Sequence, residues 1–91
     1  MFKTLEELIT LIRQRKEFLT GESYTNKLLN NKKLSVEKVK EEIAELIDAI
    51  EKNTNKVHEA TDVLYHLMVL LEANDINIED VMDELKKRQK K

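Results

Sequence analysis

An all-α fold is the structure that this sequence predicts, and three observations lead to it. The 91 residues contain no proline and a single glycine, Gly21, so little turn chemistry is available for β-hairpins. Leu, Ile, Lys and Glu dominate the composition, which favours helices. Apolar residues recur with helical spacing along most of the chain. We expect residues 1–91 to form one domain, a bundle of four to five helices.

The charge pattern and the apolar runs exclude several classes of protein. Sixteen basic and eighteen acidic residues are mixed along the chain, without the basic excess of a nucleic-acid-binding protein. The absence of cysteine excludes disulfides and thiolate metal sites. The longest apolar run, Leu67 to Leu71, is far shorter than the roughly 20 residues that cross a bilayer. We therefore expect neither nucleic acid nor a membrane as a partner, and a cytoplasmic location.

The first two helices are predicted from capping residues and apolar stripes. Thr4 and Glu7 have the spacing of a capping box, which predicts a helix start at Thr4. Its apolar stripe contains Leu5, Leu8, Ile9, Ile12 and Leu19. Gly21 can adopt the left-handed conformation and is expected to end this helix. Ser23 is predicted to cap a brief helix with Leu28 and Leu29, which ends at Asn30 and Asn31.

Three further helix starts are predicted at Ser35, Asn55 and Asn77, the last in a capping box with Asp80. The third helix is expected to bury Val36, Val39, Ile43, Leu46, Ile47 and Ile50. The fourth, from about residue 56 to 74, is expected to bury Ala60, Val63, Leu64, Leu67, Met68, Leu70 and Leu71. The last is expected to bury Ile78, Val81, Met82 and Leu85 and to end in the basic run at residues 86–91.

Acidic residues occur in two pairs on the third and fourth predicted helices. Glu42 and Glu45 are three residues apart, as are Glu59 and Asp62, so each pair can project from one side of its helix. Two antiparallel helices would bring the four carboxylates together. Projection around the third helix places Glu42 at the edge of the apolar arc and Glu41 further into solvent.

Four neighbouring carboxylates repel one another and require a positive charge to remain ionised. Oxygen ligands without cysteine favour a hard cation, Mg²⁺ or Mn²⁺. Such an ion neutralises a polyphosphate and helps water attack phosphorus, so the pattern indicates a phosphoanhydride hydrolase. The alternative is that these acids lie on solvated helix faces, since 37% of the residues are charged. His66 is expected beside Glu59 and Asp62, either orienting a carboxylate or packing at a helix edge, and His58 in solvent.

Several strings in the chain resemble a known family. They are S-Y-T-N-K-L-L at residues 23–29, K-V-K-E-E-I-A-E at residues 38–45 and E-A-T-D-V-L-Y-H-L-M-V-L-L at residues 59–71, together with the closing D-V-M-D-E-L-K-K-R. These strings resemble the phosphoribosyl-ATP pyrophosphatases of histidine biosynthesis, within the all-α NTP pyrophosphatase (MazG-like) superfamily. The resemblance implies hydrolysis of 1-(5-phosphoribosyl)-ATP to the AMP form and pyrophosphate, with Mg²⁺ (or Mn²⁺), in a homodimer.

The resemblance also implies roles for individual residues. The metal ligands would be Glu42, Glu45, Glu59 and Asp62. The catalytic residues would be Glu41 and Glu42, and the general base would be Glu41 or a metal-coordinated water. The residues near the substrate phosphates and ribose would be Ser23, Tyr24, Thr25, Lys27 and Lys38. Arg15 and Arg88 match family positions and could contact phosphate or lie in solvent or an interface.

Two other functions remain open at this point. The acidic pattern alone is shared by house-cleaning pyrophosphatases that act on other or modified nucleoside triphosphates. A non-catalytic helical dimerisation module would have the same apolar faces with solvated acids. In each case we expect a homodimer, because the apolar arcs of the third and fourth helices are broad for so small a chain to cover.

Overall fold

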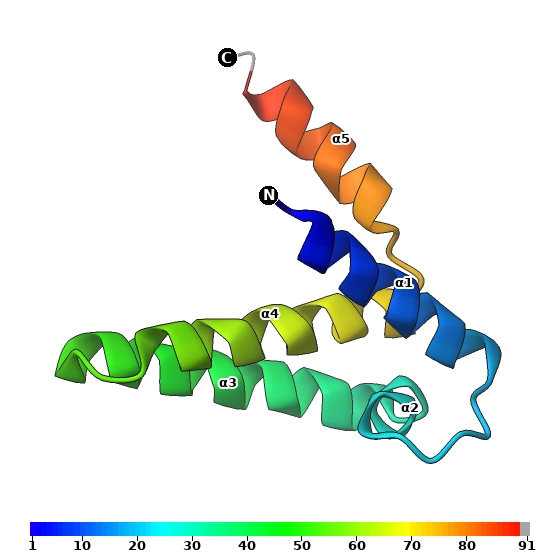
Figure 1. The fold of residues 1–91 in the computed structure, drawn as a ribbon, viewed down its shortest axis with the longest axis horizontal. Helices are drawn as coiled ribbons and strands as arrows, with labels where there is room; N and C mark the ends of the chain where they lie inside the picture. Colours follow the sequence, from blue (N-terminus) through cyan, green and yellow to red (C-terminus); the bar gives the residue numbers. More distant parts are fainter. Residues whose placement is uncertain (90–91) are drawn as a thin grey trace.

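The structure, a computed structural model, describes residues 1–89 and is all-α within that range (Figure 1). Its helices are α1 (Lys3–Glu17), α2 (Tyr24–Leu29), α3 (Lys32–Lys52), α4 (Lys56–Ala73) and α5 (Ile78–Arg88). The predicted fold class is thereby confirmed. The last two lysines of the predicted basic run, residues 90–91, lie outside the described residues. No helix within residues 1–89 is both long enough and apolar enough to cross a membrane.

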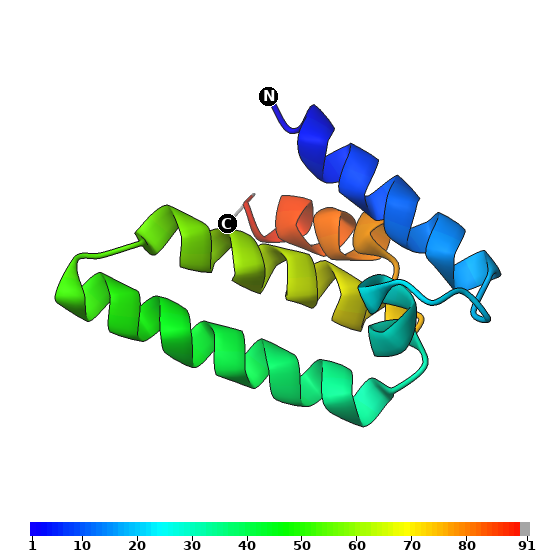
Figure 2. The ribbon, with the colours of Figure 1, turned by 60° about the horizontal axis from the view of Figure 1, so that its bottom comes forward.

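Helices α3 and α4 form an antiparallel hairpin that carries both acidic pairs. The two helices lie side by side along their lengths in both views (Figures 1 and 2). The tight connection contains Asn53 and Asn55, whose φ angles of 56° and 47° lie in the left-handed region. Asparagine tolerates this conformation better than most residues. The chain therefore reverses within a few residues and brings the two acidic pairs face to face.

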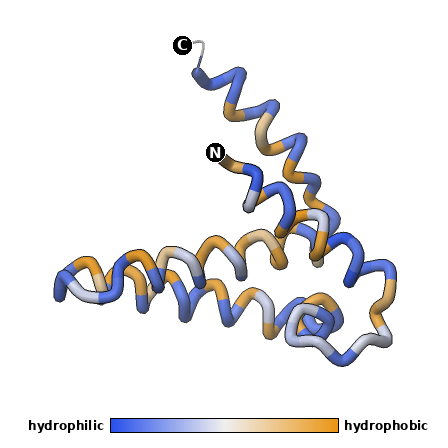
Figure 3. Tube along the Cα trace, viewed as in Figure 1, coloured by the Kyte–Doolittle hydropathy of each residue, from blue (hydrophilic) through white to orange (hydrophobic). Residues whose placement is uncertain are grey.

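The buried side of α3 differs from the predicted one. Its most buried positions follow a spacing of three or four residues and contain small and polar side chains: Ser35, Val39, Glu42 and Ala49. The predicted burial of Val36, Ile43, Ile47 and Ile50 is wrong for this chain, because these side chains are 39–56% exposed. Apolar and hydrophilic residues are interspersed along the whole of α3 (Figure 3), and its larger apolar residues lie away from the buried side.

The hydrophobic core lies at the opposite end of the hairpin from its turn, where α1 and α2 cover α4. We call Ile12, Leu28, Leu29, Met68, Val69 and Ala73 the core cluster. Ile12 belongs to the predicted apolar stripe and Met68 to the predicted core arc, whereas the burial of Val69 and Ala73 was not predicted. Two predicted core residues, Leu19 and Leu64, are 44% and 43% exposed, and Ala60 is also exposed. The buried stripe of α4 is thus rotated from the predicted arc.

The helix starts confirm some capping predictions and contradict others. Ser23 caps α2, since its hydroxyl accepts a hydrogen bond from the backbone N–H of Asn26. The prediction for Thr4 is wrong, because α1 begins at Lys3 without a side-chain cap. The prediction for Ser35 is also wrong: the Asn31 side chain caps α3 by accepting from the N–H of Leu34. Helix α3 therefore begins four residues earlier than predicted, because Asn31 is also a favourable capping residue.

The later helix starts are placed correctly but lack the expected hydrogen bonds. Asn55 and Asn77 are the residues that precede α4 and α5, and neither side chain makes a capping bond. The capping box of Asn77 and Asp80 therefore does not form. On α5, Met82 and Leu85 are about half exposed, so their predicted burial is wrong, whereas Ile78 and Val81 are half-buried.

Gly21 has a different role from the one expected. Helix α1 ends at Glu17, and Gly21 does not adopt a positive φ angle. A Cβ atom at this position would lie 2.7 Å from the side-chain oxygen of Asn26. Glycine is needed here because the backbone passes close to a buried side chain, not because a helix stops.

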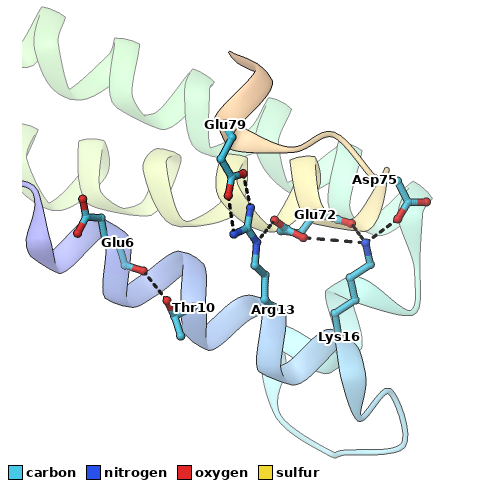
Figure 4. Close-up of polar contacts among 7 residues, drawn as sticks. All are labelled: Glu6, Thr10, Arg13, Lys16, Glu72, Asp75 and Glu79. Carbon is cyan, nitrogen blue, oxygen red and sulfur yellow. Dashed lines mark hydrogen bonds and ion pairs between the residues drawn. The ribbon is translucent and has the colours of Figure 1, made fainter. Parts of the chain in front are cut away.

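Ion pairs connect α1 with the ends of α4 and α5 (Figure 4). The guanidinium of Arg13 binds the buried Glu72 at 2.9 Å and Glu79 at 2.6 Å. Lys16 binds Asp75 at 2.6 Å and donates to the backbone carbonyl of Glu72. The packing between α1 and α4 is thus reinforced by charge at the edge of the core cluster.

Candidate active site

Three predicted metal ligands meet across the α3–α4 hairpin. Carboxylate oxygens of Glu42, Glu45 and Glu59 all lie within 4.8 Å of one another. Glu59 also belongs to a second group of the same size with His58 and Asp62. We call Glu42, Glu45, Glu59 and Asp62 the acidic cluster, in which Glu59 links the two groups. The antiparallel arrangement thus brings the two pairs together as the helical spacing indicated.

Two members of the acidic cluster are electrostatically strained. Glu42 is only 9% exposed, and one carboxylate oxygen each of Glu42 and Glu59 is buried without a hydrogen-bond partner among the described residues. Burial raises the pKa of Glu42, and the neighbouring charge of Glu45 raises it further. The pKa of Glu59 is raised by the same two causes. His66 and His58 lower the pKa values of Glu42 and Glu59 respectively, but both shifts remain upward, so the ionised carboxylates are only partly compensated by their neighbours.

Glu41 and Lys38 lie on the exposed side of α3 beside the cluster. The Lys38 ammonium is 3.4 Å from the Glu41 carboxylate, and this hydrogen bond raises the pKa of Lys38. Glu41 is exposed and belongs to neither group of close carboxylates. Its position further into solvent than Glu42 agrees with the helical projection.

The hydroxyl groups of residues 23–25 all have partners inside the protein. Ser23 accepts from the N–H of Asn26 and donates to its side-chain oxygen at 2.7 Å. The Tyr24 hydroxyl lies 2.9 Å from Nε2 of His66. Thr25 is buried and hydrogen-bonds the Tyr65 hydroxyl. Of these three residues predicted to lie near the substrate, Tyr24 and Thr25 hold α2 against α4, whereas Ser23 caps α2.

The remaining candidates lie in solvent or at the hairpin. Lys27 is exposed and makes no ion pair within residues 1–89, and Arg15 is likewise exposed. Arg88 pairs with Glu84 on its own helix. His58 is exposed, as predicted, and lies 3.4 Å from the Asp62 carboxylate. His66 is buried and makes the contact at a helix edge that was one of its two expected roles.

An open hollow of about 380 Å³ adjoins the acidic cluster at the hairpin turn. Its walls come from the end of α3, the turn and the start of α4: Ala44, Glu45, Asp48, Ala49, Thr54, Asn55 and Glu59. Sequence reasoning missed Asp48, Thr54 and Asn55 as neighbours of the cluster. The short connection between the two acidic motifs was the available signal, because a tight turn places its residues beside both pairs.

Residues with structural roles around the site were also missed. Asn26, which is 2% exposed, donates its amide to the backbone carbonyls of Arg15 and Phe18. Tyr65 binds Thr25 and stacks on the ring of Tyr24. Both lie inside the strings that carried the family resemblance, but helical spacing alone does not indicate a buried asparagine.

Comparison with known proteins places this arrangement in a family. Residues 5–89 match the family model described as phosphoribosyl-ATP pyrophosphohydrolase. The phosphoribosyl-ATP pyrophosphatase of Clostridium novyi is 43% identical over 91 residues, which cover 96% of this chain and 82% of that protein. The protein of the same name from Bacillus cereus is 42% identical over 94 residues, covering 100% of this chain and 81% of that protein.

A longer relative matches over part of its length. The histidine biosynthesis bifunctional protein HisIE of Pyrococcus furiosus is 42% identical over 87 residues, which cover 94% of this chain but only 41% of that protein. The family match spans nearly all of the described residues, including both helices of the acidic cluster. The chain belongs to the phosphoribosyl-ATP pyrophosphohydrolase family.

Proposed function

We propose that this protein hydrolyses phosphoribosyl-ATP to phosphoribosyl-AMP and pyrophosphate, a reaction of histidine biosynthesis. A water oxygen bonds to the α-phosphorus, the bond from that phosphorus to the α,β-bridging oxygen breaks, and pyrophosphate leaves. Membership of the family supports the substrate. The observation that carries the chemistry is the approach of Glu42, Glu45 and Glu59 within 4.8 Å, with two buried carboxylate oxygens lacking partners among the described residues.

The acidic cluster fits a hard divalent cation, Mg²⁺ or alternatively Mn²⁺. All its donors are carboxylate oxygens, the type that these ions prefer. The orphaned oxygens of Glu42 and Glu59 and the raised pKa values of both groups are the features that a cation would compensate. Glu42, Glu45, Glu59 and Asp62 would hold the ion. When bound, it neutralises charge on the phosphates and favours attack of water at phosphorus.

The residues around the cluster have complementary roles in the proposed reaction. Glu41 accepts the proton of the attacking water, because it is exposed and lies outside the close carboxylates. Lys38, held beside Glu41, and Lys27 on α2 neutralise phosphate oxygens. The Glu42 side chain orients the reacting groups from the buried side of α3. Tyr24 and Thr25 act through the placement of α2 on α4, and Ser23 acts as the cap of α2.

Pyrophosphate release from phosphoribosyl-ATP tests the proposal directly. Glu42→Gln combined with Asp62→Asn retains the shape of the site but removes two negative charges, and we expect a loss of at least about 100-fold in kcat/KM. Glu51→Gln is the matched control, because Glu51 is exposed on the same helix as Glu42. Full activity of the double variant would refute the site. A strong preference for a deoxynucleoside triphosphate over phosphoribosyl-ATP would assign the protein to the house-cleaning group instead.

We also propose that the protein is a homodimer formed through α3. Val36, Ile43, Ile47 and Ile50 form an exposed apolar stripe on this helix, and Leu64 on α4 is also exposed. Four large aliphatic side chains on one helix face are rarely left in water, since burying each contributes about 1.5–3 kcal/mol. A second copy of the chain offers the same stripe for a two-fold contact. Sedimentation at micromolar concentration measures the mass, and a monomer would contradict this assembly.

A further inference from the structure

Helix α2 is too short to hold its position without help from its neighbours. It contains six residues, whereas isolated helices below about 12–15 residues are marginal in water. On one side the Asn26 amide donates to the carbonyls of Arg15 (2.9 Å) and Phe18 (2.8 Å), which joins α2 to the end of α1. The opposite side must be fixed against α4.

The first contact with α4 joins Tyr24 to His66. Nδ1 of His66 lies 2.7 Å from the backbone carbonyl of Asp62, a group that can only accept, so Nδ1 donates. In the neutral imidazole Nε2 is then an acceptor, and the Tyr24 hydroxyl donates to it at 2.9 Å. The hydroxyl of Tyr24 is thereby linked to the turn of α4 that contains a predicted metal ligand.

The second contact joins Thr25 of α2 to Tyr65 of α4, the residues next to Tyr24 and His66 in the chain. The Thr25 hydroxyl pairs with the Tyr65 hydroxyl, and Thr25 is only 8% exposed. The rings of Tyr24 and Tyr65 stack with centroids 6.3 Å apart, and the His66 ring meets the Tyr65 ring edge-on at 5.0 Å. Two adjacent hydrogen bonds within an aromatic contact define one orientation of α2 on α4.

We propose that these two hydrogen bonds, Tyr24–His66 and Thr25–Tyr65, form a latch whose function is to position α2 at the active site. In this proposal the latch holds α2 so that the exposed Lys27 faces the phosphates of the substrate. The hydroxyl groups of the latch contact protein and not substrate. Direct contact of these groups with substrate would break bonds that already satisfy buried or half-buried polar atoms, which is costly. This role rests on the proposed function for its substrate, but the latch itself is a property of the free protein.

A double-mutant cycle on the free protein tests the latch. Tyr24→Phe and His66→Phe retain rings of similar size and both remove the shared hydrogen bond, and His66→Phe also removes the bond to the Asp62 carbonyl. We expect each to raise the unfolding equilibrium constant about two- to tenfold, and the double variant to differ from the larger single effect by less than about twofold. Amide exchange in α2 should accelerate in all three. Thr10→Val is the matched control, because the Thr10 hydroxyl bonds only a carbonyl of its own helix (Figure 4).

Kinetics of the same variants distinguish positioning from a purely structural role. A positioning latch predicts a KM for phosphoribosyl-ATP raised about tenfold to the same extent in Tyr24→Phe, His66→Phe and the double variant, with kcat within about twofold. A role in stability alone would leave KM unchanged in the folded fraction. Thr25→Val and Tyr65→Phe, which remove the second bond, should show the same pattern as the first pair.

Besides an unchanged KM, two further results would overturn the proposal. One is a raised KM in Tyr24→Phe with an unaltered KM in His66→Phe, which would mean that the Tyr24 hydroxyl contacts the substrate. The other is additive unfolding effects with unchanged amide exchange in α2. Failure of the unmodified protein to release pyrophosphate from phosphoribosyl-ATP would instead refute the proposed function, and the coupling measured in the free protein would be unaffected.

Discussion

The guanidinium of Arg13 lies 2.9 Å from the carboxylate of Glu72, a side chain that is only 7% exposed near the end of α4. Without Arg13, this carboxylate keeps only the more distant ammonium of Lys16, 3.9 Å away, so much of its desolvation cost is uncompensated. We therefore expect Arg13→Gln to lower the free energy of unfolding by about 1–3 kcal/mol, measured by urea denaturation. Arg88→Gln breaks a pair of exposed groups and should cost less than about 1 kcal/mol. An equal loss of unfolding free energy in Arg13→Gln and Arg88→Gln would show that the burial of Glu72 makes no difference.

The pair between Arg13 and Glu79 makes stability depend on acid pH. Hydrogen bonds from Arg13 lower the pKa of Glu79 from 4.5 to about 2. Because the value in the folded state lies below the ordinary value, the stabilisation is complete above about pH 4.5 and is lost as the pH falls towards 2. Urea denaturation at several pH values should show a smaller loss of stability between pH 5 and pH 2.5 in Arg13→Gln than in the unmodified protein. An identical pH profile would exclude this contribution.

The acidic cluster should limit the stability of the metal-free protein. Burial and the charge of Glu45 disfavour the ionised form of Glu42, so its raised pKa means that stability falls as the pH rises through that pKa. We expect Glu42→Gln to raise the melting temperature by a few degrees at pH 7 without metal. Mg²⁺ should raise the melting temperature of the unmodified protein and have little effect on this variant. A lower melting temperature for Glu42→Gln than for the unmodified protein in metal-free buffer would contradict the prediction.

Substitution of Gly21 should destabilise the protein, although its φ angle is not positive. A Cβ atom would lie 2.7 Å from Oδ1 of Asn26 and 3.3 Å from the carbonyl oxygen of Phe18. Asn26 is buried and uses its amide in two hydrogen bonds, so its side chain has little freedom to move. Gly21→Ala should cost about 1–3 kcal/mol in thermal or urea unfolding, whereas Thr20→Ala at the exposed preceding residue should be close to neutral.

The exposed apolar stripe predicts how the proposed dimer can be separated. Ile47 is 51% exposed near the middle of that stripe. Ile47→Lys places a charge at the contact and should yield monomers in sedimentation at concentrations where the unmodified protein is a dimer. Glu37→Lys adds the same residue at an exposed position of α3 about a quarter turn away from the stripe and should not change the mass. Monomers in both variants, or in neither, would point to another surface.

The sequence predicted those features that depend on local spacing. Five helices, the cap at Ser23 and the meeting of Glu42 and Glu45 with Glu59 all follow from helical periodicity and from the polar break around Asn53. Antiparallel packing of two consecutive helices is the usual result of so short a connection. The acidic cluster could therefore be placed before the structure was known.

Other features depend on contacts between distant parts of the chain. Helix α3 has apolar residues on more than one side, and periodicity cannot indicate which side lies against α4; the small residue Ala49 faces inward and Ile50 outward. The role of Gly21 depends on Asn26, whose buried amide is bound to the end of α1. The bonds of Tyr24 to His66 and of Thr25 to Tyr65 join residues about 40 positions apart in the chain, so helical spacing does not indicate them.

The two ends of the α3–α4 hairpin differ in what they contain. The core cluster gathers where α1 and α2 cover the later part of α4, whereas Glu45, Glu59 and the adjoining hollow lie towards the turn. Substitutions near the turn therefore touch few of the contacts that keep the chain folded. Residues of the acidic cluster near the turn can therefore be exchanged in experiments while the core cluster, and α2 packed on it, keep their contacts.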